Sequence, residues 1–253
     1  MKVPRVLDDL RQLREITAAR IGLPRAGASI ATREMLQFEL DHARARDAVH
    51  LPFDSEPLLH GLQQRGLDTL AVHSAAGNRS LYLQRPDLGR RLDSDSKARL
   101  DRAGTLQDVS PDLALVIADG LSTRAVHENA LPLLDAFLPL ADARGWTLAP
   151  VTVASQARVA LADEIGQLLR ARIAAILIGE RPGLSAADSL GIYLTYAPRV
   201  GRSDAERNCI SNIRAQGMSH TEAATLLQNL VAAALSRRLS GVQLKDDRML
   251  LES

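Results

Sequence analysis

The stretch AAILIGERPG, residues 174–183, is the part of the sequence that points most directly to chemistry. Five apolar residues and Gly179 run into Glu180 and Arg181, and a Pro-Gly pair then prevents regular structure from continuing. A carboxylate at such a strand end could accept hydrogen bonds from amides or hydroxyls of a bound molecule. An ion pair between Glu180 and Arg181, or a solvated loop, would fit the same pattern. Gly179 and Gly183 permit close backbone approach, which favours a binding loop.

A second candidate is ADGLST, residues 118–123, which also follows a long apolar run. Asp119 and Gly120 end that run, and Ser122 or Thr123 can cap the helix expected after it. A plain capping loop explains these residues. The free N–H groups at the start of such a helix could equally receive a polar group of a ligand.

The remaining reactive side chains give no catalytic constellation. Cys209 is the single cysteine, which excludes an intrachain disulfide and a cysteine-rich zinc site. We expect it on a helix, as a small packed residue rather than a nucleophile, because no histidine is placed to activate it. The six histidines form no pair at metal-binding helical spacing, and no phosphate-binding or dinucleotide fingerprint occurs. We therefore predict neither a catalytic residue nor a protein metal ligand.

The basic segment RPDLGRR, residues 85–91, leaves three interpretations open. It could bind an anion, form solvated surface, or lie at a subunit interface. Arg85, Arg90 and Arg91 surround a proline and a glycine, and such a segment is costly to order unless its guanidinium groups meet carboxylates or carbonyls. We predict that the segment lies at or near an interface.

Composition excludes several classes of protein. The 253 residues are 46% hydrophobic and carry 31 basic against 30 acidic side chains, so net charge implies no polyanion-binding surface. Few aromatic residues are present to stack on a nucleic-acid strand. No apolar run approaches the roughly 20 residues of a membrane span, and the first residues lack a secretory pattern. We expect a soluble cytoplasmic protein with no nucleic-acid or membrane partner.

Hydrophobic periodicity predicts an N-terminal helical subregion, residues 1–50, before an α/β domain, residues 51–245, and a tail, residues 246–253. The fold class is α/β and Rossmann-like, with a mostly parallel sheet flanked by helices and ligands outside the carboxyl ends of strands. The predicted helices cover residues 4–19, 32–50, 94–103, 123–144, 160–172, 203–214 and 219–240. The predicted strands cover residues 70–75, 80–84, 112–120, 146–154, 173–179 and 190–197, with a hairpin turn at AGNR between the first two.

Several sequence segments, taken together and in this order, resemble the small subunit of ethanolamine ammonia-lyase, over roughly residues 5–242. They are RAG (25–27), LYLQRPDLGRRL (81–92), VIADGLST (116–123), DEIGQLL (163–169), ILIGERPGLSAADSLGIYLTYAPR (176–199) and ERNCISNIRAQG (206–217).

The resemblance implies an adenosylcobalamin-dependent lyase that cleaves ethanolamine to acetaldehyde and ammonia, started by homolysis of the cobalt–carbon bond. It implies that a large subunit holds the substrate in a hetero-oligomer. This chain would be a Rossmann-like domain covering part of the cofactor between the subunits. The family's cobalamin contacts match Val159, Glu180 and Cys209 here, and Glu180 would accept hydrogen bonds from corrin amides.

Two further expectations come from the resemblance. The Asp-x-His-x-x-Gly motif of some cobalamin mutases is absent from the sequence, in keeping with a family whose cofactor keeps its own base on cobalt. Some members carry a long N-terminal extension that directs them into a bacterial microcompartment, whereas few residues precede the match here. We expect that the protein either relies on its partner for delivery into the microcompartment lumen, where the organism builds one, or works in the open cytoplasm. A stand-alone Rossmann-type enzyme and a cobalamin-binding sensor remain alternatives.

Overall fold

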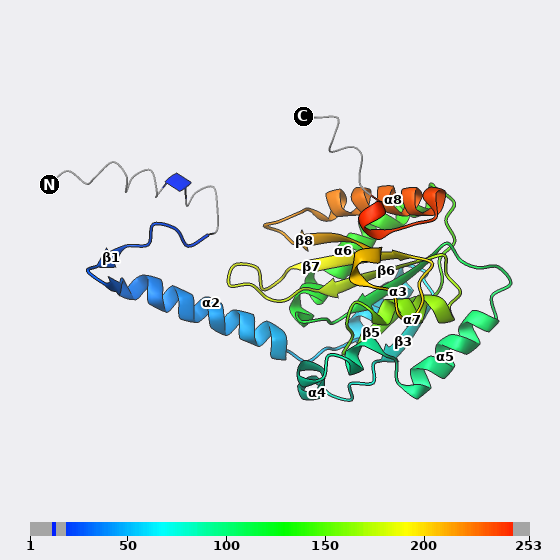
Figure 1. The fold of residues 1–253 in the computed structure, drawn as a ribbon, viewed down its shortest axis with the longest axis horizontal. Helices are drawn as coiled ribbons and strands as arrows, with labels where there is room; N and C mark the ends of the chain where they lie inside the picture. The colour runs from blue at the N-terminus through cyan, green and yellow to red at the C-terminus, as the bar shows by residue number, and fades with distance from the viewer. Residues whose placement is uncertain (1–11, 14–18, 245–253) are drawn as a thin grey trace.

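The computed structural model describes residues 12–13 and 19–244, and its centre is a six-stranded sheet (Figure 1). The strands are β3 (Thr69–His73), β4 (Leu113–Ala118), β5 (Val151–Ser155), β6 (Ile173–Gly179), β7 (Leu190–Tyr196) and β8 (Arg207–Ile213). They lie in the order β3-β5-β4-β6-β7-β8. The first four are parallel to one another, whereas β7 and β8 are each antiparallel to the preceding neighbour. The predicted α/β class with a mostly parallel sheet is confirmed, although the antiparallel pair makes the Rossmann-like label a loose fit.

The central strands are continuous apolar runs because both of their faces are covered. Every residue of β4 and β6 is buried. Alternate side chains enter two separate cores, so that Leu115 of β4 packs in one and Val116 in the other. This is the pattern expected of parallel strands flanked by helices on both faces.

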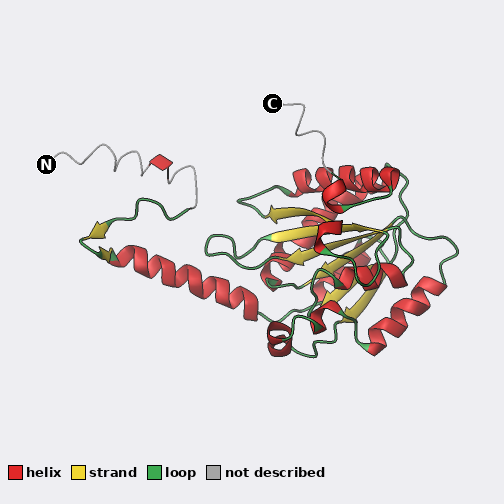
Figure 2. Cartoon of the chain, viewed as in Figure 1, coloured by secondary structure: helices red, strands yellow, loops and turns green. Residues whose placement is uncertain are grey.

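The helices divide between the two faces of the sheet (Figure 2). They are α3 (Glu56–Gln64), α4 (Arg79–Gln84), α5 (Ser94–Thr105), α6 (Thr123–Asp142), α7 (Leu161–Leu168) and α8 (His220–Arg237). Apolar residues of α3, α6 and α8 pack in one core, and those of α5 and α7 pack in the other. The β4–α6–β5 and β5–α7–β6 crossovers therefore pass over opposite faces. That arrangement places a topological switch point at the carboxyl ends of β4, β5 and β6.

Among the described residues, helix packs along one whole face of the antiparallel pair β7–β8, whereas α7 covers only part of the other face and leaves the region around Tyr193 and Cys209 uncovered. Ile192 of β7 and Ile210 of β8 point into the core that contains α8. Their neighbours on the opposite face, Tyr193 and Cys209, are register partners and are half-buried and exposed respectively. This uncovered region adjoins the start of α7 and positions the candidate site.

An N-terminal arm extends from the α/β body in Figure 1. It contains the two-stranded sheet of β1 (Arg25–Ala26) and β2 (Ser29–Ile30), followed by α2 (Thr32–His50). The bounds of α2 agree with the prediction. Apolar side chains of α2, including Leu36 and Phe38, are exposed. The predicted helix at residues 4–19 falls mostly outside the described residues, and the predicted tail at 246–253 lies wholly outside them.

The strand predicted at residues 80–84 is wrong, because this segment forms α4. The side chain of Asn78 caps it by accepting a hydrogen bond from the backbone N–H of Leu81 at 2.9 Å. The predicted turn AGNR is therefore a helix start rather than a hairpin. Asparagine is favoured both in tight turns and at helix N-caps, so the sequence pattern did not distinguish the two.

The helix predicted at residues 203–214 is also wrong. Residues Asp204–Glu206 form a single 3₁₀ turn, and β8 follows. A β-bulge, with Asn212 at φ 61°, returns Ile213 to the same face as Ile210. The bulge produces an i, i+3 apolar spacing within a strand, and that spacing resembles a helix.

Of the helices in the described ranges, none combines the length and the hydropathy that crossing a membrane requires.

Candidate functional site

A pocket of about 430 Å³ opens at the carboxyl edge of the sheet. The loops after β4, β5 and β6 supply most of its lining, as predicted for a ligand site in a parallel sheet. The lining residues are Tyr82, Gly120, Leu121, Arg158, Val159, Ile178, Gly179, Glu180, Arg181 and Tyr193. Two of the three predicted cofactor contacts, Val159 and Glu180, lie in this pocket.

The junction beneath the pocket is made of backbone. The N–H of Leu121 donates to the carbonyl of Gly179 at 2.9 Å, which joins the loop after β4 to the end of β6. A Cβ on Gly120, whose φ is +56°, would lie 2.2 Å from that carbonyl oxygen. A Cβ on Gly179 would lie 2.1 Å from the carbonyl oxygen of Ser122. The close approach predicted at Gly179 is confirmed, whereas a Cβ on Gly183 would meet only ordinary contacts at 3.8 Å or more.

Asp119 is fully buried beneath this loop and holds two strand ends together. Its carboxylate accepts hydrogen bonds from the backbone N–H groups of Gly120, Gln156 and Ala157 at 2.9–3.0 Å. The guanidinium of Arg79 contacts it at 3.3 Å. Burial raises the pKa of Asp119, and these hydrogen bonds and the arginine oppose that rise. The next residues also confirm a prediction, since the Ser122 hydroxyl caps α6 by accepting from the N–H of Ala125 at 3.2 Å.

Glu180 lies across the ends of β7 and β8. Its carboxylate accepts hydrogen bonds from the hydroxyls of Ser189 and Ser211 at 2.5 and 2.6 Å, and from the N–H of Asn212 at 3.2 Å. Gly191 leaves the space, because a Cβ there would lie 2.8 Å from Oε1 of Glu180. Among the described residues, no ion pair joins Glu180 to Arg181, which was the alternative that the sequence allowed. Glu180 is thus a half-buried acceptor on the pocket wall, anchored by the protein's own hydroxyls.

A second pocket of about 280 Å³ adjoins the first and lies on the partly covered face of β7–β8. Its lining residues are Pro86, Arg90, Arg158, Val159, Ala160, Tyr193, Asp204, Arg207 and Cys209. The two pockets share Arg158, Val159 and Tyr193. The three predicted contacts, Val159, Glu180 and Cys209, therefore line a hollow made of two adjoining pockets with a shared wall, although they come from separate parts of the chain.

Cys209 is a strand residue rather than the helical residue we predicted, and it is exposed rather than packed inside the protein. Burial of the sulfur is the main cause that raises the pKa of its thiol. A raised pKa keeps the thiol protonated at neutral pH, which disfavours nucleophilic chemistry.

Tyr82, Arg158 and Tyr193 are among the side chains of the hollow that the sequence did not point to. Tyr82 is fully buried, and its hydroxyl donates to the carbonyl of Ala157 at 3.1 Å. The guanidinium of Arg158 lies 4.3 Å from the centre of the Tyr82 ring. Tyr82 escaped notice because its helix was assigned as a strand. Arg158 and Tyr193 could have been found from their positions in the sequence. Arg158 directly precedes Val159, and Tyr193 lies in the strand that follows the loop of Glu180.

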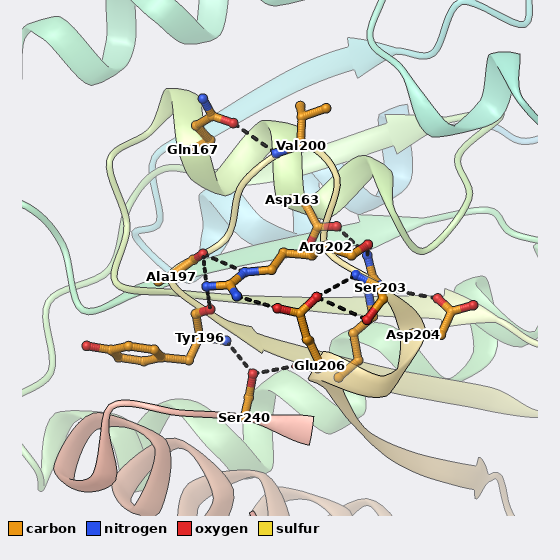
Figure 3. Close-up of polar contacts among 11 residues, drawn as sticks. Asp163, Gln167, Tyr196, Ala197, Val200, Arg202, Ser203, Asp204, Glu206 and Ser240 are labelled. Carbon is orange, nitrogen blue, oxygen red and sulfur yellow. Dashed lines mark hydrogen bonds and ion pairs between the residues drawn. The ribbon is translucent and has the colours of Figure 1, made fainter. Parts of the chain in front are cut away.

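The turn between β7 and β8, which contributes Asp204 to the second pocket, is held by a network of polar contacts (Figure 3). Arg202 donates to the carbonyls of Tyr196 and Ala197 and pairs with Glu206. The carboxylate of Glu206 in turn accepts from the N–H and hydroxyl of Ser203 at 2.7 and 3.0 Å, which closes a capping box. These contacts hold the start of β8 in place.

Arg207, the first residue of β8, makes a buried ion pair with Asp163 of α7. The side chains are 3% and 2% exposed, so both charges are removed from water and depend on each other. Burial raises the pKa of Asp163, and Arg207 opposes that rise. Asp204 lies 3.0 Å from Arg207 on the solvent side. The pair ties the partly covered strand pair to the helix that begins at the pocket.

The side chains of the two pockets are of types that bind a polar ligand. No histidine lines either pocket. Among the described residues, no group of three histidine, cysteine, aspartate or glutamate side chains could hold a metal ion. What the hollow offers is a carboxylate acceptor, two tyrosine rings and several guanidinium donors on a broad open face.

Comparison with known proteins identifies the family. The model of the family described as ethanolamine ammonia-lyase light chain (EutC) matches residues 7–245. This chain belongs to that family. A relative from Xanthomonas campestris pv. campestris, named ethanolamine ammonia-lyase small subunit, is 56% identical over 246 residues, which cover 96% of this chain and 90% of the relative. Relatives of the same name from Pseudomonas aeruginosa and Azotobacter vinelandii are 57% identical over 235 and 237 residues, covering 93% and 94% of this chain and 86% and 88% of theirs.

The resemblance seen in the sequence is thus confirmed as membership of the ethanolamine ammonia-lyase light-chain family. The match extends from the predicted N-terminal subregion through the whole α/β body. The family match therefore covers both the N-terminal arm and the sheet that carries the pockets.

Proposed function

We propose that this chain is the small subunit of an adenosylcobalamin-dependent ethanolamine ammonia-lyase and supplies one side of the cofactor site to a large subunit. The observation that carries the proposal is the pair of adjoining pockets whose linings include Val159, Glu180 and Cys209. The three residues are separate in sequence; the resemblance indicated all three, and the strand-end pattern had already indicated Glu180. Their meeting on one open face is what a shared ligand would require.

The residues of the hollow fit a corrin. A corrin is wide and flat and carries amide side chains, so it suits an open strand-pair face better than a closed cavity. Glu180 is placed to accept from amides, and its anchoring by Ser189 and Ser211 leaves part of the carboxylate's acceptor capacity free. Val159 offers a half-buried apolar contact at the edge shared by both pockets. An open face of this kind leaves the opposite side of the ligand to a partner.

When bound, adenosylcobalamin supplies the radical chemistry that starts cleavage of ethanolamine to acetaldehyde and ammonia. The residues of this chain bind and orient the cofactor, and they exclude water from one of its sides. The described hollow provides no acid–base pair for the substrate, so we assign the substrate-activating groups to the large subunit. As in the sequence-based expectation, we place the assembly in the cytoplasm, or in a microcompartment lumen where the organism builds one.

The test is co-expression with a candidate large subunit, followed by gel filtration and by titration with adenosylcobalamin monitored by absorbance. We expect a complex that binds the cofactor tightly and releases ammonia from ethanolamine, while the chain alone binds weakly and is inactive. Ammonia release by the purified chain with adenosylcobalamin would contradict the division of labour. Tight cobalamin binding by the isolated chain would favour a sensor instead.

A further inference from the structure

We propose that Arg90 and Arg158 form an anion site in the second pocket, and that it receives the phosphodiester of the cofactor's nucleotide loop. The inference rests on the proposed function, and it assigns a specific role to a basic segment for which the sequence had allowed an anion site or solvated surface and for which we predicted an interface.

The segment at residues 85–91 is fixed directly against Arg158. The backbone N–H of Arg158 donates to the carbonyl of Gly89 at 2.8 Å. A Cβ on Gly89 would lie 2.9 Å from Cγ of Arg158, so only glycine permits this approach. Because Arg90 follows Gly89 directly, its Cα is held beside Arg158, and both arginines line the same pocket.

The two guanidinium groups have no counter-charge among the described residues. Arg85 pairs with Asp87 at 2.7 Å within its own loop, and Arg207 pairs with Asp163 and Asp204. Asp204 is the sole carboxylate that lines this pocket in the described structure, and Arg207 already engages it. The pocket is therefore positive, because Arg90 and Arg158 add charges that no protein group neutralises.

Arg158 also has unused hydrogen-bonding capacity. Its Nε is buried and has no hydrogen-bond partner, and its Nη2 makes one long contact of 3.3 Å with the carbonyl of Tyr82. Stacking on the Tyr82 ring at 4.3 Å holds the guanidinium plane in place before any ligand arrives. The part of the guanidinium that lines the pocket carries a full charge, and an anion with several acceptor oxygens would be favoured there by charge-assisted hydrogen bonds.

The chemistry of the proposed cofactor selects the anion. Adenosylcobalamin carries neutral amides around its corrin, and its one anionic substituent is the phosphodiester that joins the corrin to the nucleotide base. A ligand that contacts Val159 reaches both pockets, since that residue lines each of them. The first pocket then faces corrin amides through Glu180, and the second faces the phosphodiester through the arginines.

The test compares two ligands that differ in this group. Adenosylcobalamin and adenosylcobinamide share the corrin, but the second lacks the phosphodiester and the nucleotide. Both are titrated by absorbance into the complex of this chain with its large subunit, for the parent and for Arg90→Gln and Arg158→Gln. Arg91→Gln is the matched control, because Arg91 is exposed and does not line the pocket.

We expect each test variant to raise the Kd for adenosylcobalamin about tenfold, the effect of one lost charge-assisted hydrogen bond. The Kd for adenosylcobinamide should stay within about twofold of the parent, and Arg91→Gln should change neither, since no such bond is lost in those cases. Equal weakening of both ligands, or of neither, overturns the anion site while the proposed function stands. Weakened subunit association without ligand would assign the arginines to a carboxylate of the partner and also overturn it. Failure of the parent complex to bind either ligand would overturn the proposed function, and the anion site with it.

Discussion

The two halves of the sheet differ in how they are covered, and the difference explains where the candidate site lies. The parallel half, β3-β5-β4-β6, is connected by crossover segments that contain helices, and those helices bury both faces. The antiparallel pair β7–β8 is joined to β6 by residues 180–189 and to itself by residues 197–206, and these loops and turns are too short for a covering helix. The face that the described helices cover only in part is the face that carries the second pocket.

The same comparison shows in the side chains. All residues of β4 and β6 are buried, whereas in β8 only every third residue is buried and the residues between are half-buried or exposed. Parallel strands must be protected on both sides, but an antiparallel pair can present one side to a ligand or a partner. One sheet thus combines a stable base with a binding face.

The first prediction tests what attaches the binding half to the base. Arg207→Met should destabilise the chain by about 3–5 kcal/mol, because it leaves the buried Asp163 carboxylate unpaired. The loss should be greatest in the antiparallel half, so hydrogen exchange should accelerate more in β8 than in β4. Urea denaturation and exchange mass spectrometry measure the two effects.

A double variant serves as the control. Arg207→Met with Asp163→Leu removes both charges and should recover most of the lost stability, because no uncompensated charge remains. A double variant as unstable as the single one would show that the packing of the arginine, rather than its charge, attaches β8.

The second prediction concerns the backbone junction within the parallel half. Gly179→Ala should cost about 2–3 kcal/mol, in the range of overpacked interiors, because its Cβ would meet the Ser122 carbonyl at 2.1 Å. Gly183→Ala is the matched control and should be near neutral, since its Cβ would meet only ordinary contacts. Equal denaturation midpoints for the two variants would contradict the close approach.

The third prediction concerns binding at the border between the halves. In the assembled complex, Glu180→Ala should raise the cofactor Kd by about ten- to a hundredfold, and Glu180→Gln should raise it less because an acceptor oxygen remains. Absorbance titration measures both, after melting temperature and subunit association are shown to match the parent.

Because Glu180 also holds Ser211 at the end of β8, a fold defect must be separated from a lost ligand contact. Ser211→Ala removes that internal bond while leaving the carboxylate. It should change the Kd less than Glu180→Ala does. Parent-like binding by both Glu180 variants would make Glu180 a structural loop residue only.

The smallest expected effect is a pH dependence in the turn before β8. Hydrogen bonds from Ser203, followed by that from Arg202, lower the pKa of Glu206 from 4.5 to about 2. A carboxyl whose pKa is depressed in the folded state contributes stability that is present above pH 4.5 and is lost as the pH falls toward 2. Glu206→Gln should therefore melt below the parent at pH 6, and the difference should shrink between pH 4.5 and 2. A difference that does not vary with pH would contradict this origin.

Sequence reasoning succeeded where burial alone sets the pattern. The runs that became β4 and β6 are apolar throughout because both of their faces are covered, and Ser122 was recognisable as a helix cap. It failed where a tertiary feature alters the local pattern. The bulge at Asn212 gave a strand the spacing of a helix, and Asn78 caps a helix where a turn was expected. It also could not reveal that the two pockets adjoin, because the segment with Arg158 and Val159 and the strand with Tyr193, which line both pockets, come together only in the folded chain.

The position of β7 and β8 late in the sequence also determines at what stage of synthesis the binding face forms. The pairings among β3, β5, β4 and β6 use only residues before position 180. The wall that carries Cys209 begins at Arg207, and α8, which supports its other side, ends at Arg237. Since chains are made from the N-terminus, the base of the sheet can form on the ribosome before the hollow is complete. A ligand of this face therefore meets a chain in which β8 and α8 have already been made.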